Sequence, residues 1–297
     1  MRDFQMPGRS AVMATNGMCA TSHPLAAQAA IDILKRGGNA VDAAIAGAVI
    51  LGQAEPAMTG IGGDCFALIS PAGGDDVIAI NGSGRAPAAA KADDLRSRGE
   101  TSVPLYGPEA VTIPGAIDAF CTMSERWGRL GLADSLAPAI DYMENGLPVA
   151  DRVSWDWEKN AHLLQGHART HYLLEGSTPK RGQVFRLPGN AEVLRRIAKE
   201  GRDGFYKGEV AEDMLATLNA LGGVHSEADF ANGATTIGAP IRYNTITCKT
   251  SCGKTKQWQE AQHRSLCYRD SSQSSRQHKY NRTQNRRRPR LLQIRLP

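Results

Sequence analysis

The sequence predicts a layered α+β fold for residues 1–244. Two observations lead to this prediction: apolar residues recur at helical spacing in two segments before residue 55, and two short runs then show the pattern of a β-hairpin. Further helical patterns follow. Helices that flank a hairpin bury their apolar faces against it, which is the arrangement of an α+β domain.

The first predicted helix begins at Ser22-His23-Pro24 and ends at Gly37-Gly38. We expect the serine hydroxyl to cap its first turn, where proline is also favoured, and glycine to terminate it. A second helix follows at once. Small apolar residues would let the two helices pack closely; they are Ala26, Ala29, Ala30, Ile33 and Leu34 in the first helix and Val41, Ala44, Ile45, Ala48 and Val49 in the second.

The cluster Gly60-Ile-Gly-Gly63 interrupts the helical pattern. Residues 64–70 then have the composition of a strand, residues 71–75 that of a turn, and residues 77–81 that of the partner strand. The sequence therefore predicts an antiparallel hairpin directly after the glycine cluster.

The rest of the domain is predicted to be mainly helical. Residues 111–113 suggest one more short strand, which the turn Pro114-Gly115 ends. Ser226-Glu-Ala-Asp229 resembles a capping box that opens a last short helix. The other helical patterns cover residues 116–127, 136–144, 191–199 and 210–221.

Charge divides the chain at about residue 244. Residues 1–244 contain 22 Lys and Arg against 28 Asp and Glu, a net charge of −6, whereas residues 245–297 contain 13 against 2, a net charge of +11. We expect a folded acidic domain, 1–244, followed by a basic tail, 245–297. Because all the excess positive charge lies in the tail, nucleic acid is not an expected partner of the domain.

Composition also indicates where the protein works. The chain has no run of 18 apolar residues, so no membrane partner is expected, and its first residues lack the apolar centre of a secretory signal. Cys19, Cys65 and Cys121 stand singly among apolar neighbours, as reduced core thiols do. These features favour a cytoplasmic location.

The tail, residues 245–297, has three interpretations. A change of reading frame near residue 244 would produce a random-like, disordered sequence with low hydrophobicity and high charge. A zinc module would use the pattern Cys248-x3-Cys252-x10-His263-x3-Cys267. A nucleic-acid-binding arm would use Arg286-Arg-Arg288-Pro-Arg290. On the last two interpretations, the protein would be a non-catalytic binding protein with a functional tail.

Arg85 is the first candidate functional residue. It lies in Asn81-Gly-Ser-Gly-Arg85-Ala-Pro87, directly after a predicted strand, where a loop can present a guanidinium to a carboxylate in bidentate fashion. A lone arginine on a loop is also common as a solvated surface charge. The second candidate is the cluster Gly60, Gly62 and Gly63, which either exposes backbone to a ligand or makes a tight entry into a strand. Its spacing fits neither a dinucleotide fingerprint nor a phosphate loop.

Several blocks resemble the large subunit of the γ-glutamyltransferase (γ-glutamyltranspeptidase) family. They lie in the same order between residues 17 and 243. The blocks are GMCATSHPLAAQAAIDILKRGGNAVDAAIAGAVILGQAEPAMTGIGGDCFALIS, INGSGRAPAA, VTIPGAIDAF and GFYKGEVAEDMLATLNALGGVHSEADFA. Two sequence variants within these blocks, GIGGDCFALIS and NGSGRAP, are most similar to family members without a secretion signal, a group that includes cephalosporin-acylase-like proteins.

The resemblance implies a fold, a reaction and a site. The fold is the αββα sandwich of N-terminal-nucleophile hydrolases. In the family, a precursor cuts itself, and the new N-terminal threonine of the small subunit attacks a γ-glutamyl amide such as glutathione, with its own α-amine as base. The acyl group passes to water or an amino acceptor, and no cofactor or metal is required. By position, Arg85 matches the arginine that binds the substrate α-carboxylate, and Gly60, Gly62 and Gly63 would shape the cleft wall.

The resemblance also implies that the catalytic threonine is missing from this chain. In the family, a Pro/Gly-rich segment should follow Tyr243, and a Thr-Thr-His-type processing site about a hundred residues later; residues 245–297 contain neither. Thr170-His171-Tyr172 is superficially similar to that site, but Leu173-Leu-Glu-Gly176 does not continue the small-subunit signature. We therefore expect the chain to need a small-subunit region and to be inactive alone.

Overall fold

The computed structural model describes residues 12–74, 76–244 and 249–252. The elements of the first half are α1 (Pro24–Lys35), α2 (Ala40–Ala54), β1 (Cys65–Ile69), β2 (Ile78–Gly82), α3 (Ala92–Ser97), η1 (Pro108–Ala110), α4 (Ala116–Trp127) and α5 (Leu132–Asn145). Those of the second half are β3 (Leu147–Pro148), α6 (Asp151–Asn160), η2 (Ala161–Leu163), α7 (His167–Tyr172), β4 (Val184–Phe185), α8 (Pro188–Glu200), α9 (Asp203–Tyr206), α10 (Gly208–Ala220), α11 (Glu227–Asn232), β5 (Thr236–Gly238), β6 (Ile241–Asn244) and β7 (Lys249–Cys252).

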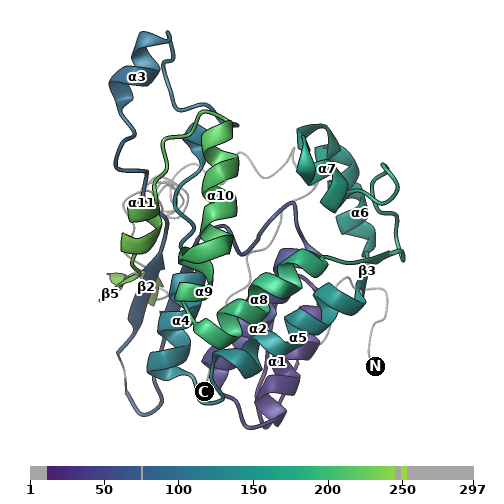
Figure 1. Ribbon diagram of the computed structural model, residues 1–297. Helices are drawn as coiled ribbons and strands as arrows, with labels where there is room; N and C mark the ends of the chain where they lie inside the picture. Colours follow the sequence, from purple (N-terminus) through teal and green to yellow (C-terminus); the bar gives the residue numbers. More distant parts are fainter. Residues whose placement is uncertain (1–11, 75, 245–248, 253–297) are drawn as a thin grey trace, which may run out of the picture.

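A three-stranded antiparallel sheet forms one side of the molecule (Figure 1), in the order β1-β2-β5. The predicted hairpin is confirmed, with Cys65 opposite Gly82 and Ile69 opposite Ile78. The third strand comes from far along the chain: β5 pairs Thr236 with Asn81. This pairing places the residues just before β5 beside the loop that follows β2.

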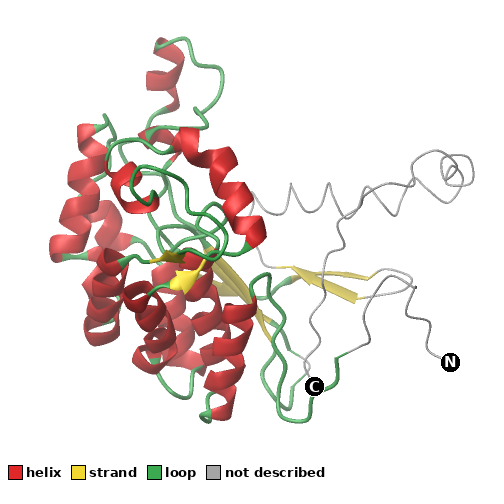
Figure 2. Cartoon of the chain, turned by 90° about the vertical axis from the view of Figure 1, so that its right-hand side faces the viewer, coloured by secondary structure: helices red, strands yellow, loops and turns green. Residues whose placement is uncertain are grey.

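Helices gather on one side of the strands (Figure 2). The first two pack closely because small residues face each other: a Cβ at Gly47 would lie 3.5 Å from the Ala26 carbonyl oxygen and 3.8 Å from the Ala30 Cβ. Helix α2 also packs against α5, and α5 against α8. As a result α2 is buried on nearly all sides, which its apolar composition permits.

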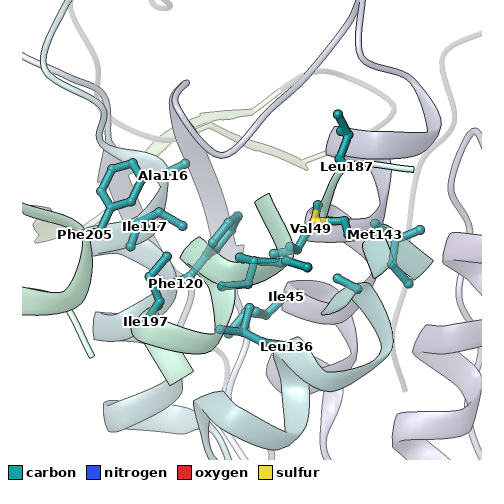
Figure 3. Close-up of a cluster of buried hydrophobic side chains, with 14 of the residues drawn as sticks. Ile45, Val49, Ala116, Ile117, Phe120, Leu136, Met143, Leu187, Ile197 and Phe205 are labelled. Carbon is teal, nitrogen blue, oxygen red and sulfur yellow. The ribbon is translucent and has the colours of Figure 1, made fainter. Parts of the chain in front are cut away.

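One large apolar core joins the helices to the sheet (Figure 3). Helix α4 packs against β1 and β2, and its Ile117 is fully buried in this core. The core continues through α2, α5 and α8, where Ile45, Leu136 and Ile197 are almost completely inaccessible to solvent. Residues whose side chains point into it from β1 and β2 alternate along the strands, as strand geometry requires.

The α+β class predicted from the sequence is confirmed. Within the described residues, the layers present are helices and the β1-β2-β5 sheet, with two short ribbons, β3–β4 and β6–β7, in addition. The capping box at Ser226 is also confirmed, since its hydroxyl accepts from the Asp229 N–H at the start of α11. No helix in the described part of the chain is long and apolar enough to cross a membrane.

Two local predictions are wrong. The N-cap of α1 is His23, whose Nδ1 accepts from the Leu25 N–H, while the Ser22 hydroxyl donates to Glu55 on a neighbouring segment. Residues 111–113 form no strand: the Ile113 N–H donates to the Arg85 carbonyl, and the Val111 carbonyl is bonded by the His225 ring. These polar groups are satisfied by loops and a side chain, so no ladder forms.

The tail predictions concern residues that are largely outside the described part. Cys248, His263 and Cys267 of the zinc pattern and residues 286–290 of the basic run lie there. Of the predicted zinc ligands, Cys252 is described, at the end of β7, where it pairs with Ile241. The boundary at residue 244 therefore stays a prediction.

Candidate functional site

Arg85 lies on the loop that leaves the sheet after β2. Its side chain is exposed, and its guanidinium forms no hydrogen bond or ion pair with the described residues. A guanidinium without an internal partner keeps its full set of donors for an external anion. The next turn of the chain is anchored by Pro87, which is buried, and by the Ala88 N–H, which donates to Asp229 of α11 at 2.9 Å.

The Arg85 loop borders a small cavity between three segments. Its volume is about 10 Å³, which corresponds to roughly one water molecule. The segments are the loop after β2, the turn before α4 and the residues before β5. The lining residues are Gly82, Ser83, Gly84, Arg85, Ile113, Pro114, Gly115, Asp118, Gly233, Ala234 and Thr235.

The first two of these segments cross at very close range. A Cβ on Gly84 would lie 1.8 Å from the Ile113 carbonyl oxygen, and a Cβ on Gly115 would lie 2.2 Å from the Gly82 carbonyl oxygen. Both distances are far inside van der Waals contact, and the atoms met are backbone atoms that cannot swing away. Glycine is therefore required at Gly84 and Gly115 for space.

Two hydrogen bonds to its backbone, one from a side chain and one from another backbone segment, hold the Arg85 loop in this crossing. The Asp64 carboxylate accepts from the Gly84 N–H at 3.0 Å. The Arg85 carbonyl accepts from the Ile113 N–H at 2.9 Å. The loop is thus attached both to the residue before β1 and to the turn before α4.

The glycine cluster before β1, residues 60–63, contacts the start of α4 through its backbone. The Gly63 carbonyl accepts from the Gly115 N–H at 3.0 Å and from the Ala116 N–H at 2.9 Å, so it caps the start of α4. Gly60, Gly62 and Gly63 are exposed, and none of them lines the cavity beside Arg85. Their predicted role as a cleft wall stays a prediction.

A partly buried ion pair holds the third segment. The Asp118 carboxylate of α4 accepts from Arg202 Nε at 2.6 Å and from the Thr235 N–H at 2.6 Å. The same guanidinium donates to the carbonyls of Phe230, Ala231 and Gly233 at the end of α11. Charge-assisted bonds of this kind are stronger than neutral ones, and here they tie the segment before β5 to α4.

The Tyr206 hydroxyl holds the turn before α4 through two hydrogen bonds. Its hydroxyl donates to the Pro114 carbonyl at 2.7 Å and accepts from the Asp118 N–H at 3.1 Å. Burial raises the pKa of Tyr206 well above its ordinary value, so the phenol stays protonated at neutral pH. The Arg202 guanidinium lies over the Tyr206 ring, 4.5 Å from its centroid. This contact links the hydrogen bonds of Arg202 to those of Tyr206.

Other nucleophile and metal candidates do not fit. Burial raises the pKa of the Cys65 thiol to about 11 and that of the Cys121 thiol to about 12, so both are protonated and unreactive at neutral pH. Thr170 and His171 lie on α7, on the opposite side of the molecule from β2 (Figure 1). In the described ranges, no group of three His, Cys, Asp or Glu side chains could hold a metal ion.

Sequence reasoning selected Arg85 as a candidate but did not predict most of the residues around it. Asp64, Asp118 and Arg202 are isolated charged residues in the sequence, and nothing in the pattern shows that the fold uses them to hold the segments around one cavity. One signal was available: glycines alternate with other residues up to Arg85, and Pro114-Gly115 precedes a helix. Paired glycine positions of this kind indicate close backbone approach.

The fold is that of the N-terminal-nucleophile hydrolases of the γ-glutamyltranspeptidase type. The structure superposes on cephalosporin acylase from Bacillus halodurans with a TM-score of 0.78 and 37% identity, over 84% of this chain and 48% of that one. It also superposes on the γ-glutamyltranspeptidase of Helicobacter pylori with a TM-score of 0.80 and 25% identity, over 86% of this chain and 74% of that one.

Residues 26–250 match the sequence model of the gamma-glutamyltranspeptidase family, and the chain belongs to that family. Among curated relatives, the glutathione hydrolase-like YwrD proenzyme of Bacillus subtilis is 36% identical over 233 residues, which are 77% of this chain and 44% of that protein. The oxamate amidohydrolase proenzyme of Klebsiella pneumoniae is 37% identical over 222 residues, 72% of this chain and 41% of that protein. The chain thus spans less than half the length of these relatives.

Proposed function

We propose that this chain forms the substrate-binding part of an enzyme that cleaves γ-glutamyl amides such as glutathione, or related acyl amides, and transfers the acyl group to water or an amino acceptor. Membership of the family supports the reaction class. The observation that carries the proposal is the Arg85 guanidinium, which is exposed and unpaired within the described residues on a loop whose backbone is rigidly held.

Arg85 would bind the carboxylate of the acyl donor. A guanidinium offers two parallel N–H groups that match the two oxygens of a carboxylate, and the pair is strongest when the cation is held in place before the anion arrives. The crossing with Ile113 and the bond from Asp64 supply that rigidity. Gly60, Gly62 and Gly63 would lie along the wall of the same cleft.

Turnover would require a small-subunit region. The resemblance assigns the nucleophilic threonine and the oxyanion donors to that region, and those groups lower the barrier of the chemical step. We therefore expect the 297-residue chain by itself neither to cleave itself nor to release glutamate from a γ-glutamyl anilide. Clear turnover that Arg85→Ala abolishes would contradict this expectation.

Binding is the direct test of the Arg85 assignment. L-Glutamine, the simplest γ-glutamyl amide, would be titrated into the full chain and followed by NMR, with 4-aminobutanamide as the analogue without an α-carboxylate. Arg85→Ala should weaken glutamine binding by about 10- to 100-fold, the usual loss for a charge-assisted pair. It should leave the already weak binding of 4-aminobutanamide unchanged.

Arg126→Ala is a matched control. Arg126 is also exposed and forms no hydrogen bond or ion pair with the described residues, but it lies at the far end of α4, about 15 Å along the helix from Ala116. Its removal changes the net charge by the same amount as Arg85→Ala, so it should leave glutamine binding unchanged. Equal affinity of the Arg85→Ala variant and the unaltered chain would refute the assignment.

We also propose that the protein works in the cytoplasm. Cys19, Cys65 and Cys121 are free thiols in the described part of the chain, which fits a reducing compartment. Fractionation of cells that produce a tagged full chain would test the location, and recovery from the extracellular fraction would contradict it.

A further inference from the structure

We propose that Asp64 is a positioning residue for Arg85: its carboxylate fixes the backbone from which the guanidinium projects. The inference rests on the proposed role of Arg85 in carboxylate binding. It is carried by the hydrogen bond of 3.0 Å from the Gly84 N–H to Asp64 Oδ1, which joins residues 20 positions apart in the sequence.

The bond occurs where the sheet loses its own hydrogen bonds. Cys65 and Gly82 are the last paired residues of β1 and β2, and the register would next bring Asp64 opposite Ser83. The two strands separate at this point, so the backbone N–H of Gly84 has no ladder partner. The Asp64 carboxylate takes the place of the missing backbone acceptor, so the chain after β2 stays attached to the start of β1 as far as Gly84.

Two hydrogen bonds hold the backbone on either side of the Arg85 Cα. The Gly84 N–H is held by Asp64 from the β1 side, and the Arg85 carbonyl is held by the Ile113 N–H from the α4 side. At Gly84 the loop already touches the Ile113 carbonyl so closely that it cannot move further in that direction. The position of the Arg85 Cα is thus restrained before any ligand is present.

The carboxylate of Asp64 acts on the backbone and forms no ion pair with Arg85. Among the described ion pairs, neither Asp64 nor Arg85 takes part. An acidic group near an anion-binding guanidinium opposes binding through its charge, while its hydrogen bond favours binding through geometry. The two contributions are separable, because asparagine keeps the acceptor oxygen and removes the charge.

The test compares variants of the full chain by NMR titration with L-glutamine. Asp64→Ala removes the acceptor and should weaken binding about three- to tenfold, the range for one hydrogen bond. Asp64→Asn should bind within about twofold of the unaltered chain, or more tightly, by the same estimate. Asp64→Glu keeps the charge but displaces the acceptor by one methylene, and it should resemble Asp64→Ala.

Two further measurements separate positioning from a general loss of stability. In the Arg85→Ala background, Asp64→Ala should have no additional effect on glutamine binding, because its effect acts through Arg85. The Gly84 amide should exchange hydrogen faster in Asp64→Ala and not in Asp64→Asn. Asp213→Ala removes an exposed carboxylate on α10 that forms no hydrogen bond or ion pair with the described residues, and it should change neither quantity.

The outcomes distinguish this inference from the proposed function. If Arg85→Ala weakens binding but Asp64→Ala does not, the positioning role is wrong and the proposed function stands. If Asp64→Asn binds as poorly as Asp64→Ala, an acceptor oxygen at this position does not position Arg85, and the inference is overturned. If Arg85→Ala leaves binding unchanged, the proposed function is wrong and the positioning role has no ligand to serve.

Discussion

Two glycine-containing segments lie at the same end of the β1-β2-β5 sheet, and their glycines have different structural roles. At Gly82, the last residue of β2, and at Gly84, in the loop that follows, added Cβ atoms would lie 2.6 Å and 1.8 Å from neighbouring atoms and collide with them. In the loop before β1, a Cβ at Gly60 or Gly62 would point into open space. None of these four glycines has a positive φ, so conformational freedom is not what separates them.

The difference shows that a glycine cluster in a sequence can have either of two causes. At Gly84 the residue must be small because another backbone passes against it. At Gly62 the described structure demands neither small size nor a special backbone conformation, and the loop contributes through the Gly63 carbonyl and the Asp64 side chain. The substitutions below test this contrast and the contacts that hold the segments around Gly84 together.

Gly84→Ala should have the largest effect. The new methyl would overlap the Ile113 carbonyl oxygen, and because both partners are backbone, the crossing must open. We expect a loss of at least about 4 kcal/mol in the free energy of unfolding, the range of severe overpacking and backbone strain. Urea unfolding followed by circular dichroism would measure it. A loss below about 1 kcal/mol would show that the crossing is not tight in solution.

Arg202→Met should come next. The variant leaves the Asp118 carboxylate without its cation and the carbonyls of Phe230, Ala231 and Gly233 without their donor. Because 26% of the Arg202 side chain remains exposed, solvent screens part of the loss, and we expect about 2–3 kcal/mol. The measurement is urea unfolding, with Arg126→Met as control. Equal stability of the two variants would contradict a stabilising role for the Arg202 contacts.

Tyr206→Phe should have a smaller effect, of about 1–2 kcal/mol, because it removes one hydroxyl that bonds the Pro114 carbonyl and the Asp118 N–H. The variant should also change the pH dependence. Burial raises the pKa of Tyr206 in the folded state above its unfolded value of about 10. The stability from this group is therefore complete below about pH 10 and is lost as the pH rises toward the folded pKa.

Stability measured between pH 8 and pH 11 would check this sign. The unaltered chain should lose stability more steeply above pH 10 than Tyr206→Phe does. The buried thiols of Cys65 and Cys121 also have raised pKa values and add a loss in the same direction to both proteins. The difference between the two curves, and not either slope alone, reports Tyr206. Parallel curves would show that the phenol is not buried as described.

Gly62→Ala should have the smallest effect, within about 0.5 kcal/mol of the unaltered chain, as for surface positions without a special role. Gly60→Ala should behave in the same way, since a Cβ there also meets nothing within 4 Å. The same urea measurement applies. Glutamine binding should be measured alongside, because a loss of affinity without a loss of stability would support the proposed cleft wall.

Local signals predicted the elements well where the physics is local. The hairpin, α4 and the capping box at Ser226 follow from alternation, helical spacing and a cap, each of which acts within a few residues. The failures are contacts between distant segments. His23 replaces Ser22 as cap because Ser22 donates to Glu55, and residues 111–113 form no strand because Arg85 and His225 satisfy their backbone.

The candidate site shows the same difference between local signals and contacts of distant segments. Arg85 was proposed as a candidate from its loop and from the family resemblance, whereas Asp64, Asp118 and Arg202 were not predicted. Asp118 and Arg202 are 84 positions apart, and their pairing depends on how α4, α9 and α11 pack. A charge in a sequence has no partner until the chain folds, so this part of the site could not be predicted from pattern.

The sequence by itself determined the α+β class, several of the helices, the β1–β2 hairpin and the family, and it singled out Arg85 as the candidate for the proposed function, because these depend on local periodicity and on blocks of residues in a fixed order. Only the tertiary structure decided which glycines must be small, what holds Arg85 and where Arg202 binds. Those outcomes depend on distances of a few ångströms between segments that are far apart along the chain, and only packing sets such distances.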